Sequence, residues 1–153
     1  MPRAAGLQYD HEVLRGKLAI LEDFLPALIA VPCTISRLTD SLATCWHAHT
    51  EREERLLDAL MRQQDTPPLS LIQQLHDEHE NQRTRLAILH ALLTDCTGAS
   101  EEQVMAQAGE LIRDLREHMA EEEAALFPLL EEYIEPSEKA WEPMSDTGVE
   151  VRS

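Results

Sequence analysis

The chain has 153 residues and a formal net charge of −16 at pH 7, so it is long enough for one domain with a sizeable hydrophobic core. The strong negative charge argues against a nucleic-acid groove or an anionic membrane surface as a partner. Its three cysteines, the lack of a signal-peptide pattern before residue 10 and the lack of an apolar run of about 20 residues predict a soluble, reduced, cytoplasmic protein.

Glycine and proline are scarce and cluster between long segments with helical periodicity, which predicts an all-α protein. We expect an up-and-down antiparallel four-helix bundle. Its helices are predicted over residues 7–30, 34–64, 69–94 and 100–134.

The predicted turns carry helix-breaking residues. They lie beside Pro32, in the sequence QQDTPPLS and in the sequence DCTGAS. Ser100 followed by Gln103 predicts a capping box that opens the fourth helix. The helical period is lost after residue 134. We therefore predict a bundle domain over residues 1–134 and an irregular C-terminal tail over residues 135–153.

The fourth predicted helix carries a histidine and a glutamate on its apolar stripe. His118 and Glu122 are one helical turn apart and therefore share a face. That stripe is expected to continue to Ala125 and Leu129. Burying a carboxylate without a partner costs on the order of several kcal/mol, so the pair requires a partner charge, a polar network or a metal ion. A metal explains both residue types, because imidazole nitrogen and carboxylate oxygen both bind iron, manganese and zinc.

The rest of the chain repeats this pattern. His49 and Glu53 have the same spacing on the second predicted helix, 69 residues earlier. A shift of 68 residues superimposes His11 on His79 and aligns the leucines around them. Each half of the chain is thus a helical hairpin whose first helix offers one core histidine and whose second offers a histidine and a glutamate.

Sequence spacing also predicts that the four core histidines lie at one height. In an antiparallel bundle, level residues on neighbouring helices are equidistant from the turn between them. The midpoints between successive core histidines all fall at or beside the predicted turns. We therefore predict one metal site built from six side chains, which are His11, His49, Glu53, His79, His118 and Glu122.

Two bridging glutamates would hold two metals about 3.5 to 4 Å apart. Each metal would then receive two imidazoles and two carboxylate oxygens. A bridging oxide or hydroxide would add a fifth ligand and leave one position of an octahedral ion open for a molecule such as O₂ or NO. Nitrogen and oxygen ligands in such a site favour iron or manganese over zinc, which prefers four ligands.

Other polar and aromatic residues near these motifs are interpreted as ordinary. Four glutamates beside the two pairs are expected to be solvated helix charges, one of which could supplement a metal's coordination; they are Glu51, Glu54, Glu121 and Glu123. Tyr9, Trp46 and Phe127 are expected to be packing residues.

Four motifs resemble the hemerythrin-like, or HHE cation-binding, family over about residues 7 to 134. They are DHEVL at His11, HTEREERLL at His49, DEH at His79 and HMAEEEAALFPLL at His118. The resemblance implies a four-helix bundle around a non-haem di-iron centre, with the six residues as iron ligands and the two glutamates bridging. Members of this family are associated with O₂ binding, with oxygen, redox or iron sensing, and with repair of iron centres.

The oxygen-carrier branch of this family has five histidine ligands, two of them four residues apart on the third helix. Here His76 and His79 are three residues apart. His76 either supplies a fifth imidazole or lies at the rim of the site. The rim is favoured because His79 aligns with the internal repeat and His76 does not.

The favoured function is a protein with two iron ions, bridged by an oxide or hydroxide, that binds O₂ or NO for oxygen or redox sensing or buffering. Iron is preferred to manganese or zinc. One alternative is a di-iron enzyme or repair factor that turns over peroxide or donates iron to damaged iron centres. Another is a metal-storage or interaction bundle.

Overall fold

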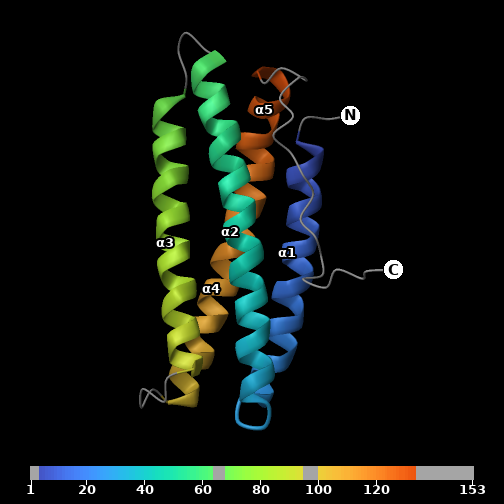
Figure 1. Ribbon diagram of the computed structural model, residues 1–153, viewed down its shortest axis with the longest axis vertical. Coiled ribbons are helices and arrows are strands. Elements are labelled where there is room, and N and C mark those ends of the chain that lie inside the picture. The colour runs from blue at the N-terminus through green and yellow to red at the C-terminus, as the bar shows by residue number, and fades with distance from the viewer. Residues whose placement is uncertain (1–3, 64–67, 95–99, 134–153) are drawn as a thin grey trace, which may run out of the picture.

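The computed structural model describes residues 4–63, 68–94 and 100–133. These residues form an all-α, antiparallel four-helix bundle, which confirms the predicted fold class (Figure 1). Helix α1 contacts α2 and α4, and α3 contacts α2 and α4, so the four rods are arranged in a ring. The elements are α1 (Ala5–Phe24), the 3₁₀ helix η1 (Leu25–Ala27), α2 (Pro32–Gln63), α3 (Leu69–Thr94), α4 (Glu101–Glu121), the π-helix η2 (Glu122–Leu126) and α5 (Phe127–Tyr133).

The ends of the helices follow the local sequence closely. Helix α1 stops at Phe24, earlier than predicted, and continues as the 3₁₀ turn that contains Pro26. Helix α2 begins at Pro32. Proline has no backbone N–H, and at the first position of a helix this costs nothing, because an N–H there would have no acceptor within the helix. The predicted capping box is confirmed, because the backbone N–H of Gln103 donates to Oγ of Ser100 at 3.1 Å and the Ser100 N–H donates to Oε1 of Gln103 at 2.9 Å. The predicted tail lies outside the described residues.

The last rod of the bundle is interrupted by a π-helical turn, which the sequence pattern did not predict. The turn over Glu122–Leu126 contains more residues than an α-helical turn and rotates the segment after it by about one position. Ala125 is therefore exposed and Leu129 only half-buried, contrary to the predicted stripe. Leu126 and Leu130 are buried in their place.

The hydrophobic core consists of two clusters with a layer of buried polar residues between them. One cluster is centred on α1, α2 and α4 and includes Leu14, Leu18, Leu42, Trp46, Leu111 and Leu115. The other lies towards the end of the bundle formed by α5 and includes Leu7, Leu57, Leu60, Leu75, Leu126 and Leu130. Each helix crosses the polar layer once. In the described part of the chain, no helix has the length and apolar character needed to span a membrane.

Candidate metal centre

The polar layer contains all six of the predicted site residues. Helix α1 contributes one of them, α2 two, α3 one, and the rod formed by α4 and η2 two. Each is buried, with at most 4% of its surface exposed. The structure therefore brings together His11, His49, Glu53, His79, His118 and Glu122 in one cluster.

The Nε2 atoms of the histidines point towards the two glutamates. The Nε2 atoms of His11 and His49 are 3.1 Å apart, and Nε2 of His79 is 3.2 Å from Oε2 of Glu53. Nε2 of His49 contacts Glu53, and Nε2 of His118 contacts Glu122.

These atoms form two groups, and the ligand atoms within each group lie within 4.8 Å of one another. We call the group with His11 and His49 the first position and the group with His79 and His118 the second position. Both groups include Glu53 and Glu122, as a pair of bridging carboxylates requires.

The hydrogen-bonding state of this cluster tests whether a metal fits. Among the described residues, both carboxylate oxygens of Glu53 and of Glu122, and the Nε2 atoms of His79 and His118, are buried without a hydrogen-bond partner. Leaving so many buried polar atoms unpaired costs on the order of several kcal/mol. Bound cations would satisfy all of them, and the set of nitrogen and oxygen donors suits a pair of metal ions.

The outward nitrogen of each histidine is held by a second carboxylate. The Nδ1 atoms of His11, His49, His79 and His118 lie 2.9, 3.1, 2.8 and 2.8 Å from Glu123, Asp10, Glu54 and Glu78, respectively. An ionised carboxylate can only accept, so each Nδ1 carries a proton, and whenever the imidazole is neutral its Nε2 is left with a lone pair that a metal ion can use. Such contacts fix the ring orientation and make the imidazole a stronger metal ligand.

The four supporting carboxylates recur at the spacing of the internal repeat, although they are not among the site residues predicted from the sequence. Asp10 directly precedes His11 and Glu78 directly precedes His79. Each accepts a hydrogen bond from the histidine on the second helix of its own hairpin, which is His49 for Asp10 and His118 for Glu78. Glu54 and Glu123 directly follow the two central glutamates of the site. Each holds a histidine of the other hairpin, which is His79 for Glu54 and His11 for Glu123. The expectation that Glu54 and Glu123 are solvated charges is wrong, because their side chains are only 23% and 25% exposed. The signal was the recurrence of these acids at the repeat spacing.

The two central glutamates are electrostatically unequal. Burial disfavours the charged form of Glu53, but attraction to His49 and close polar contacts with Glu122 and His11 outweigh it and hold its pKa well below the ordinary value. Burial raises the pKa of Glu122 well above the ordinary value, and repulsion from Glu53 adds to the shift. In the metal-free protein, Glu122 therefore takes up a proton more readily than Glu53 does.

The histidines respond to the same charges. Burial opposes protonation of His49, but Glu53 and Asp10 outweigh it and raise its pKa to about 9. Burial lowers the pKa of His79, but attraction to Glu53 and the hydrogen bond of Nδ1 with Glu54 outweigh it, so the pKa is raised. The pKa of His118 falls to about 4, mainly because of burial, with repulsion from His79 as a further cause.

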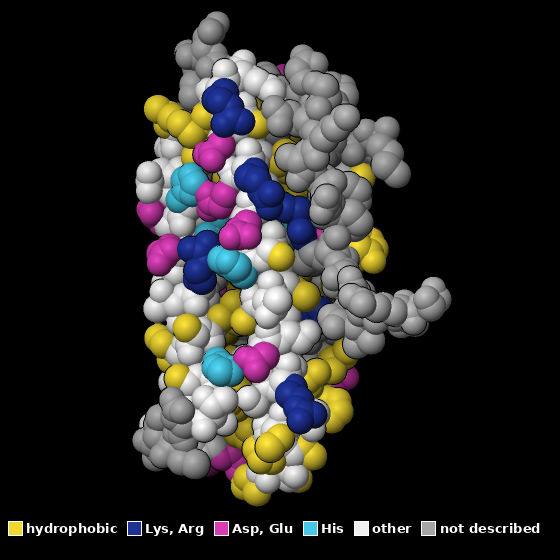
Figure 2. Space-filling model, viewed as in Figure 1, with side chains coloured by type: hydrophobic (Ala, Val, Ile, Leu, Met, Phe, Trp, Pro, Cys, Tyr) yellow, Lys and Arg dark blue, Asp and Glu magenta, His cyan; other side chains and the backbone are white. Residues whose placement is uncertain are grey.

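His76 lies at the rim of the site. Its side chain is 37% exposed and its Nδ1 contacts Glu54, which also holds His79. On the surface, the Nε2 atoms of His47 and His90 lie 3.2 and 2.7 Å from carboxylate oxygens of Glu51 and Asp40, respectively. On the face of the molecule that Figure 2 shows, exposed histidine side chains lie next to acidic side chains.

Aromatic residues pack around the centre. Trp46 is buried, donates from Nε1 to Gln82 at 3.1 Å, and its ring lies about 6 Å from the rings of both His49 and His118. Phe127 packs on His11 with ring centroids 5.0 Å apart. The packing role is confirmed for these two residues. Tyr9 is 43% exposed, so it is not a core packing residue.

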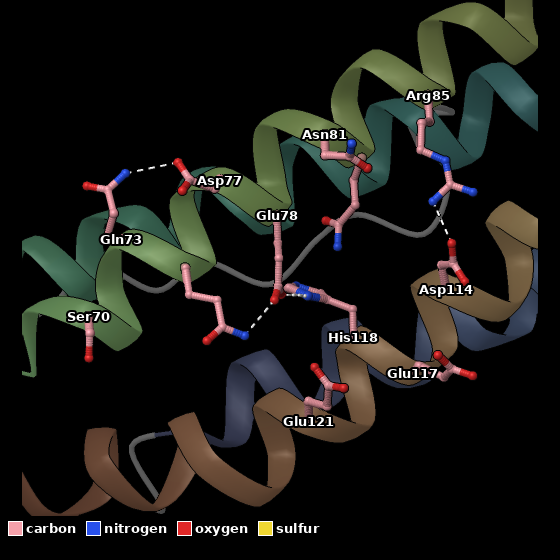
Figure 3. Close-up of a pocket in the computed structure, with 12 residues that line it drawn as sticks. Ser70, Gln73, Asp77, Glu78, Asn81, Arg85, Asp114, Glu117, His118 and Glu121 are labelled. Carbon is pink, nitrogen blue, oxygen red and sulfur yellow. Dashed lines mark hydrogen bonds and ion pairs between the residues drawn. The ribbon is translucent and has the colours of Figure 1, made fainter.

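A cavity of about 680 Å³ lies between α3 and α4 beside the second position. Glu78 reaches from α3 to His118 on α4, and Glu121 lies on the α4 side (Figure 3). Asp77 and Glu117 also line the cavity. We call this cavity the α3–α4 groove. It brings solvent-facing carboxylates next to a residue of the metal cluster.

Arg15 makes a testable contribution to acid stability through Glu123. Its Nη1 and Nη2 lie 2.7 and 3.0 Å from the two carboxylate oxygens, and these hydrogen bonds are the main cause that lowers the pKa of Glu123 to about 2. The folded state therefore gains stability that is fully present above the ordinary value of 4.5 and is lost as the pH falls from there towards 2. We expect Arg15→Gln to reduce the loss of stability between pH 5 and pH 3, measured by urea denaturation.

The matched control for this prediction is Arg83→Gln. Arg83 occupies the equivalent position in the second hairpin but pairs only with exposed Glu80 among the described residues. The control should keep the acid sensitivity of the wild type. Equal acid sensitivity in Arg15→Gln and the wild type would contradict the prediction.

The fold and the cluster together define a four-helix-bundle protein with a buried site of histidine and glutamate that binds metal. The model of the family described as the hemerythrin HHE cation binding domain matches residues 4–130. The chain therefore belongs to the hemerythrin HHE cation-binding family, and the expected resemblance is confirmed. Comparisons with curated proteins and with solved structures each return no significant match.

Proposed function

We propose that this protein holds two iron ions in the polar layer and binds O₂ or NO there, for oxygen or redox sensing or buffering. The observation that carries the proposal is the pair of buried clusters that share Glu53 and Glu122. Four imidazole nitrogens and two carboxylates are a donor set that suits iron. As ligands we propose the six residues predicted from the sequence, with His76 outside the set because it contacts Glu54 instead.

The residues of the chain would prepare the site for a small neutral ligand. The four supporting carboxylates orient the imidazoles, and the two hydrophobic clusters keep bulk water from the layer between them. When bound, an iron pair would supply the open coordination position and the electrons that uptake of O₂ or NO requires. The cytoplasmic location expected from the sequence is part of this proposal.

Metal analysis and spectroscopy test the proposal. Protein loaded with iron without oxygen should contain two iron ions per chain, and the reduced protein should develop a new charge-transfer absorption band when O₂ or NO is added. The control is the double variant His49→Ala, His118→Ala, which removes one imidazole from each position. A wild-type protein that holds two iron ions but shows no spectral response to either gas would refute ligand binding.

The α3–α4 groove supports a second candidate function, the donation of iron to damaged iron centres. Its carboxylates could pass a divalent cation between solvent and the second position. Transfer of iron from the loaded protein to a metal-free iron–sulfur protein, faster than from free iron, would favour this function. Peroxide turnover well above that of free iron would favour an enzyme instead, and fewer than two metals per chain would favour a storage or interaction bundle.

A further inference from the structure

The two metal positions differ in how their supporting carboxylates are neutralised. At the first position, Asp10 accepts from Nε and Nη2 of Arg52 at 2.9 and 2.7 Å. Glu123 accepts from both terminal nitrogens of Arg15. Each carboxylate that holds a histidine of this position is thus paired with a permanently charged guanidinium.

The second position has no such compensation in the described part of the chain. Glu78 accepts from Nε2 of Gln74 at 2.8 Å, and Glu54 contacts Nδ1 of His76. An amide carries no charge, and an imidazole is charged only when it is protonated. Part of this difference comes from two arginines at equivalent places in the internal repeat. Arg15 pairs with Glu123, whereas its counterpart Arg83 pairs with Glu80 on the surface.

This difference acts on the electrostatic field at the two metal positions. The negative charges of Asp10 and Glu123 are offset by adjacent guanidinium groups, whereas those of Glu54 and Glu78 have no such partner among the described residues. The second position therefore has more uncompensated negative charge near its ligand atoms, which favours a divalent cation there over the first position.

The α3–α4 groove adds easier access to the same position. His118 and Glu78 line it together with Asp77, Glu117 and Glu121 (Figure 3). Arg85 also lines the groove but is paired with Asp114, so carboxylates dominate its charge. A groove whose charge is predominantly of one sign raises the local concentration of ions of the opposite sign. Divalent cations are therefore drawn to the surface above the second position.

We propose that the second position, between His79 and His118, takes up the first divalent cation and binds it more tightly than the first position does. Arg15 and Arg52 set this order by neutralising the carboxylates of the first position. The inference rests on the proposed pair of metals, but it concerns affinity and order of loading, which do not depend on the reaction with O₂ or NO.

Titration of the metal-free full-length protein with Co²⁺, followed by calorimetry and visible absorption, tests the order. We expect two binding steps in the wild type, the first at least about tenfold tighter, because supporting contacts of this kind change metal affinity by about 10 to 100-fold. His49→Ala and His118→Ala are matched variants at equivalent places in the repeat. His49→Ala should keep the tighter step, whereas His118→Ala should lose it.

Charge variants provide a second test that does not require removal of a ligand. Arg15→Gln leaves Glu123 without its guanidinium, so the weaker step should strengthen and the ratio of the two affinities should fall. Arg83→Gln should leave the ratio unchanged. If a histidine variant does not fold, as judged by circular dichroism, this pair alone decides the question.

The outcomes separate the inference from the proposed function. Two steps of equal affinity, loss of the tighter step in His49→Ala but not in His118→Ala, or an unchanged ratio in Arg15→Gln would overturn the loading order. Binding of fewer than two Co²⁺ per wild-type chain would instead contradict the pair of metal positions on which the proposed function depends.

Discussion

Loading the metal centre is expected to raise the free energy of unfolding by about 4 kcal/mol for each position at which free metal is about 1,000-fold above the dissociation constant of that position. The physical reason is that six buried polar atoms lack a hydrogen-bond partner among the described residues, and a metal ion would pair with them. These atoms are the four carboxylate oxygens of Glu53 and Glu122 and the Nε2 atoms of His79 and His118. A ligand that binds only the folded state stabilises it by mass action. Chemical denaturation of the iron-loaded and the chelator-treated protein, both without oxygen, measures the difference.

The double variant His49→Ala, His118→Ala is the control for this experiment. It should bind metal poorly at both positions, so chelation should hardly change its stability. A midpoint of unfolding in the wild type that does not depend on metal concentration would show that the polar layer is stable without a cation. The hydrogen bonds of the supporting carboxylates would then be the main stabilising contacts of the layer.

The sequence was sufficient to predict the bundle and the six residues that converge within it. The apolar residues follow a helical period over long segments, and the breaks at Pro32 and near Gly98 place the turns. Because helices in such a bundle are straight and antiparallel, residue number measures height, and the four histidines could be placed at one level. The structure confirms this convergence, which was an inference about geometry.

Two features could not be inferred in the same way. The π turn changes the register after Glu122, and no breaking residue marks its start, so the predicted stripe passed through Ala125 instead of Leu126. The supporting carboxylates were missed because an acid beside a buried residue usually faces solvent. Glu123 reaches His11 on another helix, and such a contact depends on the distance between helices, which periodicity does not give.

The metal-free protein should lose much more stability when Glu53 is replaced by glutamine than when Glu122 is. Glu53 is ionised and contacts His49, whose pKa is raised to about 9, so the histidine is charged at pH 7. Glu53→Gln leaves that charge buried without its main partner and should cost about 3 to 5 kcal/mol of unfolding free energy. Urea denaturation of the metal-free variants at pH 7 measures the loss.

Glu122→Gln should cost the metal-free protein no more than about 1 kcal/mol, or stabilise it, because the raised pKa of Glu122 favours its neutral form and the amide is neutral too. The raised pKa of Glu122 means that the folded state holds a proton that the unfolded state releases, so the wild type loses stability as the pH rises above 4.5 towards the pKa in the folded state. The variant should lack this decline. In the internal repeat the two glutamates occupy equivalent positions. Equal losses of stability in the two variants would therefore contradict the inferred difference in pKa between Glu53 and Glu122. Unequal losses would show that the two halves of the duplication keep the same ligands but have diverged in their electrostatics.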